Sequence, residues 1–343
     1  MKNVQPRRPV CRLTPIGAAP QALTVGAAMN CWITAHSGKH KPSTHAAYRA
    51  VAEKHIRREL GNLAVGTLSP EQVADYLQRK SSGNEALPPL ASSTVCSIIT
   101  VLRASFRAAE QQGVAVRAWD GLCRPRQAKR TAEVLSPGEQ ALLEEHLWAR
   151  GDPEALGMLL CLYTGLRIGE VCALKWGDIS EEGVVAVQRT VQRIRNPDYA
   201  GAGDRRTVII FDTPKSEASR RAVPIPSILW QAMAPLRREP ACFLLTGQAD
   251  AFREPRVLQN HFKATLRRAG VRDINFHALR HTFATNCVEL GFDPKTLSRI
   301  LGHCDVTVTL NTYVHPSLSA MRSMMERLNE RRPGGTPPDV RKI

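Results

Sequence analysis

Apolar residues recur every three or four positions through the first third of the chain, a spacing that predicts helices. The clearest run follows Ser93 and ends at Gly113, and it places on one face Val95, Ile98, Ile99, Leu102 and Phe106. Helices are also predicted over 23–35 and 43–58, and no strand-like alternation interrupts them. We therefore expect residues 21–113 to form a small all-helical bundle.

Three helix starts carry strong local signals. Ser69 and Ser136 each precede a proline, and a Gln or Glu follows three residues after each serine, which is the pattern of a capping box. Asp152 likewise stands before a proline and a glutamate. The signal at Ser136 predicts that a second helical region opens there.

The spacing of apolar residues changes in the middle of this second region. β-Branched residues gather in three runs, 184–191, 207–210 and 222–225, which predict a small antiparallel sheet. Residues 196–204 contain glycine and predict a long hairpin loop. Helical spacing resumes over 257–301, so we expect the second region to be mainly helical.

Pattern and composition divide the chain into five segments. Residues 1–20 are rich in proline and basic residues and show no pattern, so we expect a flexible basic tail. A helical domain at 21–113 is followed by a basic linker at 114–134, a second domain at 135–330 and a disordered tail at 331–343.

The chain is basic, because 47 Lys and Arg residues face 31 Asp and Glu residues and give a net charge of +16. Such an excess favours a polyanionic partner. No apolar run approaches the ~18 residues that a membrane-spanning helix needs. The first residues also lack the apolar stretch of a secretory signal. Nucleic acid is therefore favoured over a membrane as the partner.

The nine cysteines are an odd number and include no C-x-x-C pair. Several of them, such as Cys161 and Cys172, lie in apolar stretches, where reduced thiols pack as small hydrophobic groups. We therefore expect a cytoplasmic protein with reduced cysteines and no zinc site.

The predicted linker carries four cations within seven residues, at Arg124, Arg126, Lys129 and Arg130. One interpretation of this run is a solvated hinge between the two domains. The other, which the net charge of the chain favours, is a strap that lies over the phosphates of a nucleic acid.

Four short motifs in the second region supply residues suited to binding one phosphate. The motifs are T-G-L-R-I-G-E, T-P-K, H-A-L-R-H and L-G-H, and a tyrosine lies ten residues after the histidine of the last one. The residues of interest are Arg167, Lys215, His277, Arg280, His303 and Tyr313. Arginine binds two oxygens with its planar fork, and a tyrosine hydroxyl can form a covalent phosphotyrosine. The cations would stabilise the developing charge without a metal. No carboxylate cluster suited to Mg²⁺ appears, so we expect no metal and no cofactor.

Each of these residues taken alone has an ordinary structural interpretation. Arg167 could point into solvent from a helix start, Lys215 could be a solvated turn residue, and His277 could be a hydrogen-bonded core histidine. His303 could cap the C-terminus of a helix, and Tyr313 could be a half-buried ring. Their joint occurrence favours a single site.

The four motifs, in this order, resemble the catalytic domain of the tyrosine recombinases, the lambda-integrase-like family. The similar stretches are 164–170, 213–226, 277–285 and 301–315, within a region of about 135–328. The resemblance implies a mainly α fold, in which an N-terminal SAM-like helical bundle binds DNA. This bundle would be joined to a mainly helical catalytic domain with a small antiparallel β-sheet.

The resemblance makes Tyr313 the nucleophile, which attacks the scissile phosphate, forms a 3′-phosphotyrosyl link and releases a 5′-hydroxyl. Lys215 resembles the lysine that protonates the leaving 5′-oxygen. The energy of the broken bond is kept in the phosphotyrosine, so ligation needs no ATP.

The same resemblance assigns the groups around the phosphate. Arg167 and Arg280 would hold the non-bridging oxygens, and His303 would hydrogen-bond the phosphate in the transition state. His277 would help to take the proton of the tyrosine. Glu170 resembles the acidic residue that supports the first arginine from one helical turn away.

The implied activity is site-specific recombination of double-stranded DNA, which integrates or excises a mobile element. The implied assembly is a homotetramer on two DNA sites, with accessory DNA-bending proteins as further partners. Two alternatives share the chemistry: a recombinase that resolves chromosome or plasmid dimers, and a type IB topoisomerase-like enzyme that relaxes DNA. A non-catalytic DNA-binding protein is a third class, against which Tyr313 and the full set of cations argue.

Overall fold

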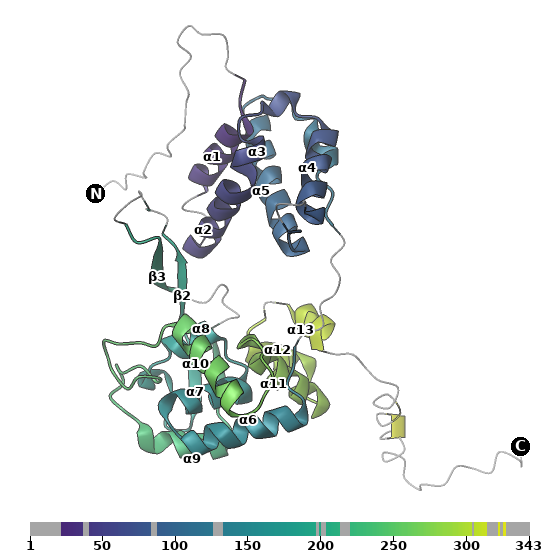
Figure 1. Ribbon diagram of the computed structural model, residues 1–343. Helices are drawn as coiled ribbons and strands as arrows, with labels where there is room; N and C mark the ends of the chain where they lie inside the picture. Colours follow the sequence, from purple (N-terminus) through teal and green to yellow (C-terminus); the bar gives the residue numbers. More distant parts are fainter. Residues whose placement is uncertain are drawn as a thin grey trace, which may run out of the picture. The chain divides into compact units, whose positions relative to one another are not determined.

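The computed structural model of this 343-residue chain divides it into two compact units (Figure 1). One unit comprises Met1–Arg130 with Arg193–Val208, and the other comprises Thr131–Gln192 with Ile209–Ile343. The residues that the structure describes are 22–36, 41–83, 88–125, 133–196, 199, 204–212, 220–303, 305–313, 322, 325 and 326, and for 308 and 311–313 only the backbone is described.

In its described part, the first unit is built from five α-helices, which confirm the predicted helical bundle (Figure 1). They are α1 (Val25–Ala35), α2 (Pro42–Val51), α3 (Arg57–Leu60), α4 (Pro70–Ser82) and α5 (Ser92–Glu110). A π-helical turn at Ala52–Ile56 joins α2 to α3. The long helix α5 is central, because α1, α2 and α4 all pack against it.

The face of α5 that the sequence predicts to be apolar is buried in the core of this unit. The five residues of this face are each 1% exposed or less: Val95, Ile98, Ile99, Leu102 and Phe106. Burial of such side chains is the main favourable term in folding, at roughly 25 cal/mol per Å². The predicted capping box of α4 also forms: the Gln72 N–H donates to Ser69 Oγ at 3.2 Å, and the Ser69 N–H donates to Gln72 Oε1 at 2.9 Å.

The first part of the predicted linker, 114–134, packs into the core of the first unit. A short 3₁₀ helix, Ala118–Gly121, packs against α4, and both Ala118 and Leu122 are buried in the core of the first unit. Trp119 stacks edge-on against Phe106 with ring centroids 5.8 Å apart, and its Nε1–H donates to Glu110 Oε1 at 2.7 Å. Residues 114–122 therefore belong to the first unit.

The second unit surrounds one buried helix. Its described helices are α6 (Pro137–Arg150), α7 (Pro153–Thr164), α8 (Ile168–Ala173), α9 (Ser227–Met233), α10 (Pro255–Arg268), α11 (His277–Glu289), α12 (Pro294–Leu301) and α13 (Val306–Tyr313). α7 is buried along almost its whole length and packs against α6, α8, α9 and α11. None of the described helices in either unit is both long and apolar enough to cross a bilayer.

The predicted sheet is divided into two pairs of strands. β1 (Val184–Val187) pairs antiparallel with β4 (Arg221–Pro224), and β2 (Thr190–Arg195) pairs with β3 (Thr207–Asp212). The predicted run 184–191 breaks before β2, where the Arg189 side chain turns inward and Nη2 donates to Asp178 Oδ1 at 2.6 Å. Arg193–Val208, which includes the end of β2 and the start of β3, belongs to the first unit. The sequence instead predicts an uninterrupted domain at 135–330.

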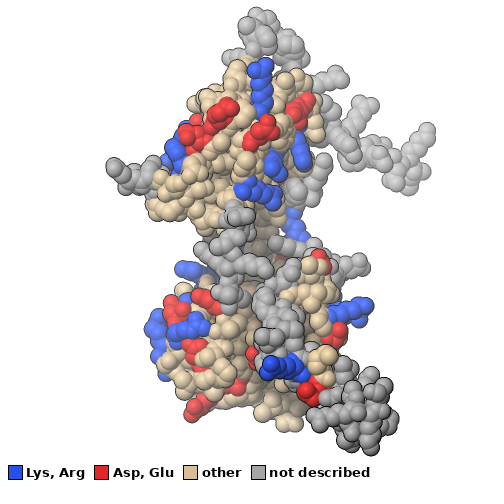
Figure 2. Space-filling model, turned by 90° about the vertical axis from the view of Figure 1, so that its right-hand side faces the viewer, with Lys and Arg blue, Asp and Glu red and all other residues tan. Residues whose placement is uncertain are grey.

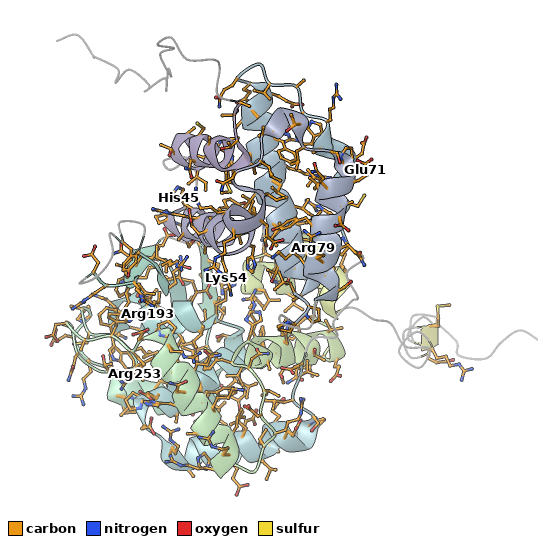
Figure 3. All side chains as sticks on the ribbon, turned by 45° about the horizontal axis from the view of Figure 1, so that its top comes forward. His45, Lys54, Glu71, Arg79, Arg193 and Arg253 are labelled. Carbon is orange, nitrogen blue, oxygen red and sulfur yellow. The ribbon has the colours of Figure 1, made fainter. Side chains whose placement is uncertain are left out.

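The charged side chains of the described surface are mixed in sign. Figure 2 shows Lys and Arg interspersed with Asp and Glu on the face of each unit that it presents. In the first unit, Lys54 and Arg79, both labelled in Figure 3, line a cavity of about 630 Å³ together with Glu53 and Glu59. Lys80, which also lines it, pairs with Glu59, so part of the positive charge here is neutralised locally.

Candidate active site

Arg167 stands where α7 ends and α8 begins. Gly165 closes α7 with a φ of +67°, a left-handed conformation that favours glycine. A Cβ at this position would lie 2.6 Å from Phe283 Cδ1, so a side chain would displace the ring. Arg167 is then the extended N-cap residue of α8, and its backbone N–H donates to Glu170 Oε2 at 2.9 Å. The short loop therefore fixes the point from which the Arg167 side chain extends.

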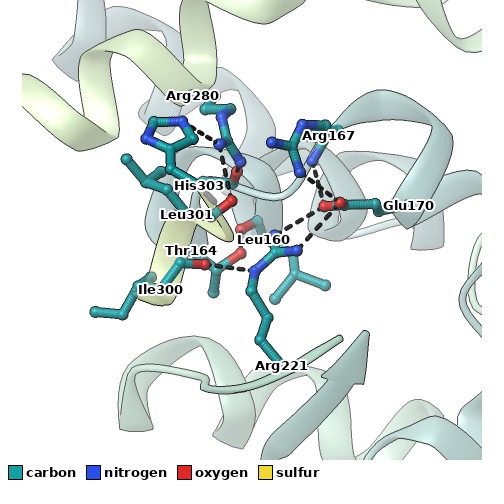
Figure 4. Close-up of polar contacts among 10 residues, drawn as sticks. Leu160, Thr164, Arg167, Glu170, Arg221, Arg280, Ile300, Leu301 and His303 are labelled. Carbon is teal, nitrogen blue, oxygen red and sulfur yellow. Dashed lines mark hydrogen bonds and ion pairs between the residues drawn. The ribbon is translucent and has the colours of Figure 1, made fainter. Parts of the chain in front are cut away.

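Arg280 donates hydrogen bonds to both the loop before α8 and the end of α12 (Figure 4). It is 2% exposed, on the buried face of α11. Its Nη1 donates to Gly165 O at 2.7 Å, and its Nη2 donates to Leu301 O at 2.8 Å. Nη2 also lies 2.9 Å from His303 Nε2. Segments that are far apart in the sequence thus meet at one guanidinium group.

The contact with Arg280 determines which nitrogen of His303 carries the proton. A guanidinium group has donors only, so His303 Nε2 must accept, and the ring proton of the neutral form is then on Nδ1. Nδ1 lies 2.8 Å from Thr309 Oγ1, which accepts this hydrogen. Burial, followed by the charges of Arg280, Arg167 and Arg221, lowers the pKa of His303 to about 4. His303 is therefore neutral near pH 7.

Glu170 is a buried carboxylate shared by two arginines. It is 5% exposed, and its oxygens accept from Arg167 Nη1 at 2.8 Å and from Arg221 Nη1 and Nη2 at 3.1 and 2.8 Å. Burial alone would raise the pKa of Glu170, but the hydrogen bonds and charge of Arg221, and then the charge of Arg167, outweigh burial and lower it to about 2. The carboxylate is therefore ionised throughout the physiological range.

His277 is the first residue of α11 and lies close to a second histidine. Its ring meets that of His281 edge-on, with the centroids 4.7 Å apart. Loss of hydration, then the charges of His281, Arg280 and Arg167, lowers the pKa of His277. His277 is thus a neutral imidazole at pH 7 and a group able to accept a proton.

Residues 151–319 match the Phage integrase family. The chain is 27% identical over 340 residues to a XerC-like tyrosine recombinase from Caldanaerobacter subterraneus subsp. tengcongensis, a match that covers 90% of this chain and 84% of that one. The chain belongs to the tyrosine recombinase family. It is therefore an enzyme of the class that recombines DNA site-specifically, as the resemblance of its motifs predicts.

Other relatives of this tyrosine recombinase come from mobile elements. The transposase of transposon Tn916 from Enterococcus faecalis is 28% identical over 190 residues, which are 50% of this chain and 45% of the transposase. The fold is that of the Tn1549 transposon integrase in complex with circular intermediate DNA, with a TM-score of 0.68, 23% identity and coverage of 89% of this chain and 99% of that one. A lambda integrase tetramer bound to a Holliday junction matches with a TM-score of 0.60 at 16% identity, over 86% of this chain and 78% of that one.

The structure of this tyrosine recombinase brings together four of the residues expected from sequence, which are Arg167, Glu170, Arg280 and His303 (Figure 4). His277 lies at the start of the helix that carries Arg280. Lys215 lies outside the described residues, and so do Arg126, Lys129 and Arg130. Tyr313 is the last residue of α13, and only the backbone of Tyr313 is described. Arg124, the remaining cation of the predicted linker, is exposed.

Two further residues of the cluster are not found by sequence reasoning. Arg221 follows a second arginine on a short strand, a pattern that predicts exposure, yet it is buried against Glu170. Thr309 is fully buried and holds His303, and its only signal is its place on the helix that ends at Tyr313. Among the described residues, no three His, Cys, Asp or Glu side chains gather in a way that could hold a metal ion.

Proposed function

We propose that this chain integrates or excises a mobile DNA element by cutting and rejoining DNA through a 3′-phosphotyrosyl intermediate. The observation that carries the proposal is the cluster of Arg167, Arg280 and His303, which come from the start of α8, the first turn of α11 and the segment after α12. The charge of Arg167 acts on both His303 and His277, since it lowers the pKa of each. A set of fixed cations and neutral imidazoles of this kind is suited to a phosphate that gains charge as it reacts.

The cleavage step would begin with attack of the Tyr313 hydroxyl oxygen on the scissile phosphorus. As the new P–O bond forms, the tyrosine proton passes to His277, and the bond to the 5′-oxygen breaks. Lys215 supplies a proton to that oxygen, which leaves as a 5′-hydroxyl. Ligation is the reverse reaction with the 5′-hydroxyl of another strand, so the number of phosphodiester bonds is conserved and no ATP is required.

The pentavalent phosphorane between these two states carries extra negative charge on its non-bridging oxygens. Arg167 and Arg280 would bind these oxygens through their planar forks. Because Arg280 is held by two backbone carbonyls, its guanidinium needs little reorganisation during the reaction. His303 would give the third hydrogen bond from Nε2, which requires that this nitrogen carry a proton.

The proposed partner is double-stranded DNA, bound by four copies of the chain at two sites. The lambda integrase tetramer on a Holliday junction is an example of this assembly in a protein of the same fold. Relatives from transposons, such as the transposase of Tn916, support integration as the proposed activity. The XerC-like relative is the reason that dimer resolution is kept as the second candidate.

A plasmid assay separates these functions. Duplexes that bind the full chain would first be selected from a random library, and the resulting site is called the selected duplex. We expect recombination between two plasmids that each carry the selected duplex, measured as joined circles on an agarose gel. Plasmids without the site should stay supercoiled. Relaxation of any plasmid would indicate a topoisomerase, and resolution of plasmid dimers without joining of separate plasmids would indicate dimer resolution.

The basic run of the linker gives a second prediction. Changing Arg124, Arg126, Lys129 and Arg130 to serine should weaken binding of the selected duplex and flatten its salt dependence. Each lost phosphate contact lowers the slope of log affinity against log salt by about 0.9. Filter binding at low and at moderate salt measures this slope.

The matched control for this prediction removes two exposed cations elsewhere. Arg267→Ser with Arg268→Ser lies in the last turn of α10, and we expect it to change the slope less, per cation removed, than the linker variant does. A linker variant with the slope of the unchanged protein would mean that the run is a solvated hinge.

A further inference from the structure

Arg221 contacts two separate parts of the site, the carboxylate of Glu170 and the end of α12. It lies at the start of β4, and its side chain is 5% exposed. Its Nη1 and Nη2 donate to the two oxygens of Glu170, and its Nε donates to Ile300 O at 2.5 Å (Figure 4). All three nitrogens of the guanidinium group are thus used, and they reach residues that are 51 and 79 positions away in the sequence.

One end of this contact fixes Arg167. Glu170 accepts from both the backbone and the side chain of Arg167, so whatever orients the carboxylate also orients that arginine. Arg221 contributes to charge as well as to position. Without it, the negative charge of Glu170 would be balanced by Arg167 alone, and less of the Arg167 charge would be available to a phosphate.

The other end fixes the segment that carries His303. Ile300 is in the last turn of α12, next to Leu301, whose carbonyl accepts from Arg280. Gly302 follows with a φ of +68°, and a Cβ there would come within 3.0 Å of Arg221 Nη1 and 3.1 Å of its Cδ. Glycine at the end of α12 therefore leaves room for the Arg221 side chain to pass directly beneath the turn that leads into His303.

We propose that Arg221 is a positioning residue, which orients Arg167 through Glu170 and His303 through the end of α12, so that the two phosphate-binding groups are held in one arrangement. This inference rests on the proposed function of the site. A merely structural ion pair would stabilise the fold without setting the state of His303. The two interpretations therefore make different predictions for His303 in a variant that keeps the positive charge at position 221 but loses the hydrogen bonds of the guanidinium group.

Arg221→Lys is the variant that keeps the charge and loses the geometry. A lysine has one nitrogen, which cannot bind both oxygens of Glu170 and Ile300 O together. The matched control is Arg220→Lys, the same change at the exposed neighbouring residue. For each protein we would measure thermal unfolding, affinity for the selected duplex, single-turnover formation of the covalent adduct on a nicked selected duplex, and the ¹⁵N resonances of the His303 ring.

We expect Arg221→Lys to form the adduct about 10²-fold more slowly, the loss typical of a disturbed charge-stabilising group. Its affinity for DNA should stay within about twofold of that of Arg220→Lys. In the unchanged protein, His303 should show one neutral tautomer with the proton on Nδ1 and a pKa near 4. In Arg221→Lys, both tautomers should appear and the pKa should move toward the ordinary histidine value of 6.5. A His303 signal like that of the control would overturn the inference.

A second pair of variants covers the case in which Arg221→Lys fails to fold. Glu170→Gln with Arg221→Gln removes both buried charges, so no unpaired charge is left in the core. We expect His303 to lose its single tautomer in this double variant but to keep it in Glu170→Gln alone, where Arg221 still reaches Ile300 O. Equal His303 spectra in the two would contradict the proposal. If the unchanged protein forms no adduct while the spectra behave as expected, the proposed function fails and the positioning role stands.

Discussion

Replacing Tyr313 with phenylalanine is expected to abolish the covalent protein–DNA adduct while DNA binding stays within about twofold. The change removes one oxygen atom, which is the proposed nucleophile, and it leaves the cations around the phosphate in place. No other group can then form the phosphotyrosine bond. The measurement is a denaturing gel on the nicked selected duplex, in which a trapped adduct runs as a slower band.

The control for this prediction is the same chemical change at a tyrosine with no proposed role. Tyr199 is 38% exposed, and Tyr199→Phe should give a normal adduct band. A covalent band from the Tyr313→Phe protein would show that another residue is the nucleophile, and the assignment would be withdrawn.

The two arginines should each contribute a large factor to the rate of cleavage. We expect Arg280→Lys and Arg167→Ala to slow single-turnover adduct formation by about 10²–10³, corresponding to about 2.7–4 kcal/mol of lost transition-state stabilisation. Lysine at 280 keeps the charge but cannot reach both Gly165 O and Leu301 O while also facing the phosphate. Affinity for the selected duplex should fall much less than the rate.

Burial separates the effects of these two variants on stability. The Arg167 side chain is 36% exposed, so Arg167→Ala should unfold at nearly the temperature of the unchanged protein. Arg280 is 2% exposed, and a change there should also lower the unfolding temperature. If either variant cleaves within tenfold of the unchanged rate, that arginine is a structural residue and not part of the reaction.

Local patterns predict those parts of the fold that depend on neighbouring residues. The capping boxes at Ser69 and Ser136 and the apolar face of α5 form as expected, because each involves residues within a few turns of one helix. The segment at 114–122 is different. Its apolar residues enter the core through a 3₁₀ turn, so they lack the period by which helices are recognised.

The candidate site shows the same division between local and distant determinants. Arg167, Glu170, Arg280 and His303 lie in motifs, and their residue types and order along the chain are enough to indicate phosphate chemistry. Arg221 is missed because its burial depends on a carboxylate and a carbonyl that lie 51 and 79 residues away. No local pattern on a four-residue strand encodes such partners, and two adjacent arginines ordinarily indicate exposure.

The hydrogen bond between His303 and Thr309 has a consequence for how the proposed reaction can cycle. Phosphate oxygens only accept hydrogen bonds, so in the proposed reaction His303 would carry a proton on Nε2 when it contacts the phosphate, and Nδ1 of the neutral ring would then be an acceptor. A hydroxyl can rotate to donate instead of accept, so Thr309 serves the ring in both states. Thr309 is fully buried, so this hydroxyl is the partner of Nδ1 inside the folded unit. Thr309, one helical turn before the proposed nucleophile Tyr313, can thus partner Nδ1 of His303 in either tautomer, so that no buried polar atom is left unsatisfied.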